Sequence, residues 1–193
     1  MVLPVIVVLT MEHSAATQIE LFEEQLSRTK EYRAALAKTY RLLGMRNRSE
    51  KELREALARA KYADEIIAAV LEKCREQHFV DDAKFAQQFV QSRLRNRPMG
   101  RARLKLELRN KGISDAIIAA TLDAAFAPDE ALTLANQLAE KQRKRLARLP
   151  VAKAQQRLAD FLRRRGFDWE TIQLTGVWRA LQANKEADLE SKL

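Results

Sequence analysis

Residues 104–122 read LKLELRNKGISDAIIAATL, and a matching stretch, LREALARAKYADEIIAAVL, occupies residues 53–71. At an offset of 51 residues the two stretches share leucines, an aspartate and an Ile-Ile-Ala-Ala run. A weaker third copy follows the second at an offset of 54. Self-similarity with a period of this length is typical of repeat proteins.

The residues that flank each copy predict helices. Ser49 and Glu52 form a capping-box pattern that begins a helix. Gly112 suits the left-handed position that ends one, and Ser114 or Asp115 then caps the next. Another amphipathic segment precedes each pair of helices. The sequence therefore predicts an all-α fold built from three tandem three-helix repeats.

We expect an N-terminal extension over 1–30, partly helical or loosely ordered, before repeats at 31–79, 80–126 and 127–193, the last with a C-terminal tail. The apolar opening MVLPVIVVLT is too short to span a bilayer. It lacks the basic start of a typical secretory signal, although a signal remains an alternative. Met1 and Met11 are both candidate start sites.

Residues 101–110, RARLKLELRN, carry the one conflicting pattern. Their alternating leucines favour a strand. Their register with the capped helix of the first copy favours a helix, which we predict. On a helix, Leu104 and Leu108 share the buried face, while Arg101, Lys105 and Arg109 form a stripe beside it. Like charges at this spacing repel each other, which indicates an anionic partner.

Positive charge is concentrated in two blocks of this chain, whose net charge is +9. Residues 91–112 hold eight basic and one acidic side chain, and residues 141–166 hold ten and one. The intervening residues 113–140 hold five acidic side chains and no basic one. Single-sign blocks attract polyanions or acidic protein surfaces. The alternative is that these side chains only solubilise the helices and cover apolar surface with their stems.

From these blocks we select the residues expected to bind an anionic partner, either a polyanion such as DNA or an acidic protein surface. They are Arg93, Arg97, Arg101, Lys105, Arg109, Lys111, Lys141, Lys144, Arg145, Arg148, Arg163, Arg164 and Arg165.

Catalytic and metal-binding patterns are absent from the sequence. There is no P-loop, no nucleophile elbow and no acid–base pair with catalytic spacing, so we predict that the protein is not an enzyme. Two histidines and one cysteine make a zinc site improbable. Cys74 is expected to be a small buried hydrophobe, and a single cysteine favours a reducing compartment. Trp169 and Trp178 are expected to pack rather than to stack on bases.

Four segments, in this order, resemble the RecX family of bacterial regulators of the recombinase RecA. They are RLLGMRNRSEKELREAL (41–57), FVDDAKFAQQFVQSRL (79–94), MGRARLKLELRNKGIS (99–114) and FLRRRGFDWETIQLTGVW (161–178). The resemblance covers about residues 31–183. The family usually has glycine near positions 61 and 78, where this chain has Lys61 and His78. We therefore expect those two turns to be built differently.

The resemblance implies that the three-helix repeats form an elongated, solenoid-like array. It also implies a negative regulator of homologous recombination, DNA repair and the SOS response. Such a protein lodges in the groove of a RecA–DNA filament and lowers ATP hydrolysis and strand exchange. The resemblance also implies a cytoplasmic monomer without cofactor or membrane contact. The competing interpretation is a helical-repeat protein that binds DNA phosphates directly. It predicts tight, salt-sensitive binding to naked DNA, whereas the filament interpretation predicts that binding to naked DNA is weak.

Overall fold

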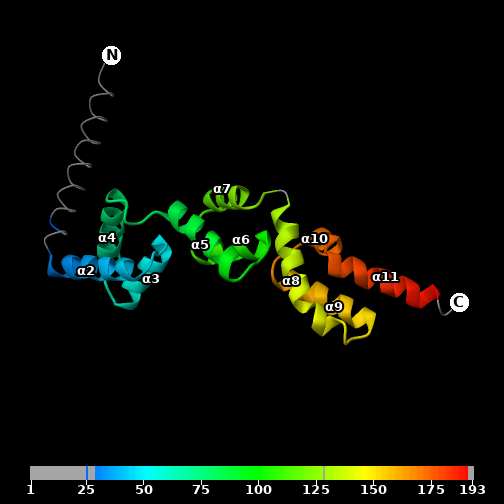
Figure 1. Ribbon diagram of the computed structural model, residues 1–193. Coiled ribbons are helices and arrows are strands. Elements are labelled where there is room, and N and C mark those ends of the chain that lie inside the picture. Colours follow the sequence, from blue (N-terminus) through cyan, green and yellow to red (C-terminus); the bar gives the residue numbers. More distant parts are fainter. Residues whose placement is uncertain (1–24, 26–28, 128, 191–193) are drawn as a thin grey trace, which may run out of the picture. The chain divides into compact units, whose positions relative to one another are not determined.

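The computed structural model describes residues 25, 29–127 and 129–190, and within these residues every regular element is a helix (Figure 1). This confirms the predicted all-α class. The expectations for Met1, Met11 and the apolar opening lie outside the described residues. The repeat boundaries given above stay predictions.

The first compact unit ends at Asp81, and its continuously described part, residues 29–81, forms three helices. They are α2 (Lys30–Met45), α3 (Glu50–Arg59) and α4 (Asp64–Glu76). Each of the three contacts the other two. Their shared core includes Leu53, Leu57, Ile67, Val70, Leu71 and Cys74. Cys74 is fully buried, as predicted.

The second compact unit starts at Asp82 and contains the remaining helices. They are α5 (Asp82–Asn96), α6 (Arg101–Asn110), α7 (Asp115–Ala125), α8 (Glu130–Leu146), α9 (Val151–Arg164), α10 (Trp169–Leu174) and α11 (Gly176–Glu190). Two hydrophobic cores lie in this unit, one within α5–α7 and one within α8–α11. Leu94 and Phe126 pack against both cores and so connect them.

Equivalent leucines form the centre of every repeat. Two leucines, four residues apart on the middle helix of each repeat, are 0% exposed. These pairs are Leu53 and Leu57, Leu104 and Leu108, and Leu158 and Leu162. The sequence alignment of the three copies is therefore confirmed as a structural one.

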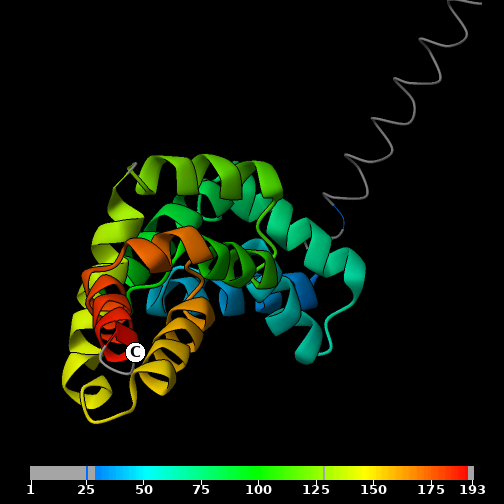
Figure 2. The ribbon, with the colours of Figure 1, turned by 90° about the vertical axis from the view of Figure 1, so that its right-hand side faces the viewer.

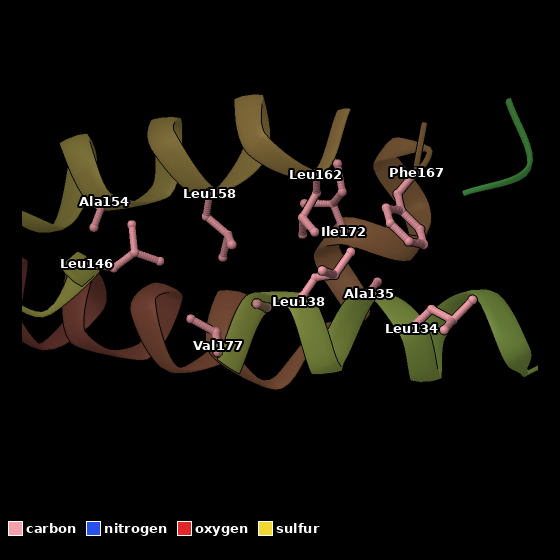
Figure 3. Packing of buried hydrophobic residues seen from close by; sticks show 11 residues of the cluster. Leu134, Ala135, Leu138, Leu146, Ala154, Leu158, Leu162, Phe167, Ile172 and Val177 are labelled. Carbon is pink, nitrogen blue, oxygen red and sulfur yellow. The ribbon is translucent and has the colours of Figure 1, made fainter. Parts of the chain in front are cut away.

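The core of the third repeat lies between α8 and α9 (Figure 3). Leu158 and Leu162 extend from α9 toward Leu138 on α8, and Ile172 of the short helix α10 fills the space beside them. The predicted C-terminal tail includes helix α11, which runs alongside α9 and α8 (Figure 2). Val177 of α11 is buried in the same core.

Side-chain caps begin the helices where the sequence predicted them. The Ser49 hydroxyl accepts from the Glu52 N–H at 3.3 Å, and the Ser114 hydroxyl accepts from the Ile117 N–H at 3.4 Å. Ser114, rather than Asp115, is therefore the capping residue of α7. Asp168 caps α10 in the same way.

The expectation that the turns at Lys61 and His78 differ from the glycine turns is wrong. The φ angle is 63° at Lys61 and 56° at His78, against 82° at Gly112 and 87° at Gly166. In the first of these turns the Tyr62 N–H donates to the Leu57 carbonyl, and the equivalent Ile113 N–H donates to the Leu108 carbonyl. These bonds use only main-chain groups, so Lys and His can make them despite the cost of a left-handed conformation.

The conflicting pattern at 101–110 resolves as the helix α6, as predicted. Leu104 and Leu108 are buried, whereas Leu106 points the other way and is 49% exposed. The alternation that imitated a strand therefore arises from one apolar side chain on the solvent face of a helix.

Candidate functional site

The α6 stripe, defined as Arg101, Lys105 and Arg109, faces the acidic helix α7. Arg101 forms an ion pair with Asp123, and Arg109 forms a two-pronged pair with Asp115 at 2.8 and 3.0 Å. The Arg109 guanidinium holds the pKa of the Asp115 carboxyl below its usual value. The chain's own carboxylates therefore offset the repulsion along this stripe, and binding of an external anion by the stripe stays a prediction.

A cavity of about 600 Å³ lies where the second and third repeats meet, and we call it the junction cavity. Its lining comes from α5, α6, the end of α9 and the turns that follow α5 and α9. The lining residues are Arg93, Arg97, Met99, Ala102, Arg103, Leu106, Glu107, Arg163, Arg164, Arg165 and Gly166. Six of these eleven side chains are arginines and one is acidic. Members of both basic blocks thus meet at one place.

Glu107 positions two of these arginines. Its carboxylate accepts from Arg93 Nε at 2.9 Å and from Arg103 Nε at 3.2 Å. The Arg93 guanidinium also lies over the Phe89 ring, 4.6 Å from its centroid. A guanidinium fixed by an ion pair and a ring loses little conformational entropy when it binds an anion.

Arg165 is held on the opposite wall by the turn that precedes α6. Its guanidinium donates to the Pro98 carbonyl at 3.3 Å and lies 5.3 Å from the centroid of the Phe161 ring. The Gly100 N–H donates to the Arg165 carbonyl at 2.8 Å. These contacts join the turn before α6 to the turn after α9.

Two glycines make that joint possible. A Cβ placed on Gly100 would lie 2.5 Å from the Gly166 carbonyl carbon and 2.8 Å from the Phe167 nitrogen. A Cβ on Gly166 would lie 2.5 Å from the Arg103 Cβ. The two main chains therefore approach each other more closely than any other residue type allows.

A second cavity of about 400 Å³ adjoins α9, and we call it the α9 cavity. Arg145 of α8 and Arg157 of α9 line it, together with Arg164, which also lines the junction cavity. Asp160 is its acidic member. The two cavities share Arg164, and we call the arginines that line them the arginine strip: Arg93, Arg97, Arg103, Arg145, Arg157, Arg163, Arg164 and Arg165.

The arginines of the strip differ in their existing partners. Arg97, Arg163 and Arg164 are exposed, and no described carboxylate lies within ion-pair distance of them. Arg93 and Arg103, by contrast, share Glu107. The strip therefore combines fixed cations with cations available to a ligand.

The remaining predicted residues lie away from the junction cavity. Lys111 is the half-buried C-cap of α6. Lys141 and Lys144 lie exposed on the last turns of α8, and Arg148 follows that helix. The structure therefore divides the predicted set into the arginine strip, the α6 stripe, an exposed group on and after α8, and Lys111 at the end of α6.

Two arginines of the strip, Arg103 and Arg157, were missed by sequence reasoning. They occupy the same position of the repeat, immediately before the first buried leucine of the middle helix, at the offset of 54. The alignment of the copies therefore contained the signal. The i, i+4 spacing instead selected Arg101, Lys105 and Arg109, which lie on another face of α6 from Arg103.

Other kinds of site find no support in the part of the chain that the structure describes. Among those residues, no group of three or more His, Cys, Asp or Glu side chains could hold a metal ion. Among the same residues, no helix is both long and apolar enough to cross a membrane. Trp169 and Trp178 pack edge to face, with ring centroids 5.0 Å apart.

The fold and the arginine strip define a tandem helical-repeat protein with a surface suited to an anionic partner. Family models of RecX match all three repeats in order. The first three-helix domain matches residues 35–74, the second 81–122 and the third 129–174. The chain belongs to the RecX family.

Curated relatives and solved structures agree with this assignment. The chain is 34% identical to "Regulatory protein RecX" of Pelodictyon phaeoclathratiforme, over 72% of this chain and 84% of the relative. It is 36% identical to the protein of that name from Chlorobaculum tepidum, over 74% and 86%. The crystal structure of RecX from Lactobacillus salivarius superposes with a TM-score of 0.68, at 20% identity over 79% of this chain and 97% of that one. That structural likeness supports the fold.

Proposed function

We propose that this protein is a negative regulator of homologous recombination and DNA repair that binds in the groove of a RecA–DNA filament. Bound there, it inhibits the recombinase's ATPase and strand exchange. It acts as a cytoplasmic monomer without a cofactor or catalytic activity of its own. The observation that carries the proposal is the arginine strip, present on a chain whose three repeats all match the RecX family.

The proposed mechanism uses many weak contacts. A filament presents the same groove surface at every subunit, and tandem repeats offer several contacts to neighbouring subunits. Linked weak contacts bind much more tightly than any one of them. Inhibition further requires that the protein bind one state of the filament better than another.

All thirteen residues selected from the sequence belong to the proposed contact surface, and Arg103 and Arg157 join them. Each supplies positive charge to acidic filament residues or to DNA phosphate, and arginine also binds such groups in a two-pronged manner. Because most of these side chains are exposed, we expect single substitutions to have small effects and groups of substitutions to have large ones.

A direct DNA-binding function is the second candidate, favoured by the excess of arginine over carboxylate in the junction cavity. It predicts comparable affinity for naked and recombinase-coated DNA. The filament proposal predicts much stronger binding to coated DNA. Anisotropy titrations with one labelled oligonucleotide, with and without recombinase, distinguish the two.

The decisive experiment measures the recombinase's ATPase on single-stranded DNA with this protein at substoichiometric ratio. We expect inhibition, and its absence would contradict the proposed function. Substituting glutamate for Arg101, Lys105 and Arg109 together tests the α6 stripe separately. Full inhibition by that variant would remove the stripe from the contact surface.

A further inference from the structure

We propose that the arginine strip is a binding site for the sugar–phosphate backbone of single-stranded nucleic acid, with successive phosphates seated in the junction cavity and the α9 cavity. Identifying this strand with the one in a recombinase filament rests on the proposed function. Binding of a naked strand by the arginine strip does not depend on the proposed function.

The charge of the junction cavity fits a polyanion. Six arginines face one carboxylate, Glu107, and that carboxylate is already shared between two of them. A single carboxylate ligand would leave most of this positive charge uncompensated. A polynucleotide strand brings one negative charge with every nucleotide, so consecutive phosphates supply several charges to neighbouring arginines.

The arrangement of the two cavities fits a chain rather than an isolated ion. Arg164 lines both cavities, and Arg145 and Arg157 continue the positive lining along α8 and α9. A ligand that occupies both cavities must be extended and must carry charge at more than one point. Positively charged grooves of this kind follow the backbone of single strands.

Apolar surface inside the cavity favours a nucleotide over an acidic peptide. Leu106 lines the junction cavity while remaining 49% exposed. The guanidinium groups of Arg93 and Arg165 lie over the rings of Phe89 and Phe161, so their planes are oriented by aromatic supports. Leucine offers contact to a sugar or base, and guanidinium planes are surfaces on which unpaired bases stack. A duplex would keep its bases stacked inside and could not use these surfaces.

The test uses a fluorescein-labelled oligo(dT) of about twenty nucleotides and the full chain, without recombinase. In fluorescence anisotropy, the logarithm of the affinity is plotted against the logarithm of the salt concentration. Replacing Arg97, Arg163 and Arg164 together with Gln should lower the steepness of this plot by about 2, since each phosphate contact contributes about 0.7 on a single strand. If the native chain and the variant bind equally at about 1 M salt, this difference in slope corresponds to roughly 100-fold weaker binding of the variant at about 0.1 M salt.

A matched control removes the same charge from outside both cavities. Replacing Arg143, Lys153 and Arg179 with Gln subtracts three positive charges from exposed side chains of the third repeat that line neither cavity. This variant should keep the slope and most of the affinity. Tryptophan fluorescence, which reports on the third repeat, verifies that both variants remain folded. Leu106→Ala should weaken binding several-fold without changing the slope.

Three outcomes would overturn the inference. They are the failure of the native chain to bind oligo(dT) at low salt, equal losses in the two triple variants, and stronger binding of a glutamate-rich peptide than of the oligonucleotide. None of these concerns the ATPase of the recombinase, so the inference and the proposed function can fail independently.

Discussion

Adding a single methyl group at Gly100 should loosen the joint between the second and third repeats. The Cβ of Gly100→Ala would lie 2.5 Å from the Gly166 carbonyl carbon, about 1 Å closer than carbon atoms normally approach. Relief of this overlap requires the two turns to separate. Overpacking of this kind costs about 1–3 kcal/mol.

Separation also disturbs the bond from the Gly100 N–H to the Arg165 carbonyl, which is 2.8 Å long. Such a bond contributes about 1 kcal/mol. The combined expectation is a loss of about 2–4 kcal/mol from the second unit, which lowers its melting temperature by roughly 5–15 °C. Both tryptophans lie in the third repeat, so tryptophan fluorescence follows the melting of this unit.

Two control variants isolate the cause. Gly100 is also the N-cap of α6, where serine is a better cap than alanine. If the joint is responsible, Gly100→Ser destabilises as much as Gly100→Ala, whereas a capping effect would make serine harmless. Gly44 in α2 has nothing within 4 Å of its added Cβ, so Gly44→Ala should stabilise the first unit by about 0.5 kcal/mol. Melting of both Gly100 variants within about 1 °C of the native chain would refute this account of the joint.

Three further predictions concern the turns, the cysteine and an exposed ion pair. Lys61→Gly and His78→Gly should each raise the free energy of unfolding of the first unit by about 1 kcal/mol in urea titrations, because glycine removes the cost of the left-handed conformation. Burial raises the pKa of the Cys74 thiol, so a thiol reagent should react slowly with the native protein and rapidly in denaturant. The pKa of the Asp115 carboxyl is lowered by Arg109, so the pair contributes stability above about pH 4 and loses it as pH falls through the lowered pKa. NMR titration of Arg109→Gln should find the Asp115 pKa closer to its ordinary value.

The helical repeat was predictable because it depends on short-range signals. Ser49 and Ser114 cap where their sequence neighbours indicated, and the leucine pairs are buried at the positions that the alignment gave. The turns at Lys61 and His78 were not predictable from residue preference alone. There the main-chain bonds and the packing of the flanking helices outweigh a local cost of about 1–2 kcal/mol.

The candidate site was only partly predictable, since it depends on which helix faces meet. The two basic blocks were visible in the sequence, but their meeting at the junction cavity requires the contact between Gly100 and Gly166. Likewise, the acidic block at 113–140 was visible in the sequence. Its pairing with the α6 stripe, Asp123 with Arg101 and Asp115 with Arg109, was not. Charge counts along a chain carry no information on the direction in which each side chain points.

The carboxylates of α7 have a kinetic consequence for any complex. An incoming acidic group that engages Arg101 or Arg109 must first displace Asp123 or Asp115, and those carboxylates remain tethered nearby, ready to rebind. Contacts at this face would form and break quickly, so they can guide an approaching partner without lengthening the time it stays bound. The lifetime of a complex would then be determined on the opposite side of α6.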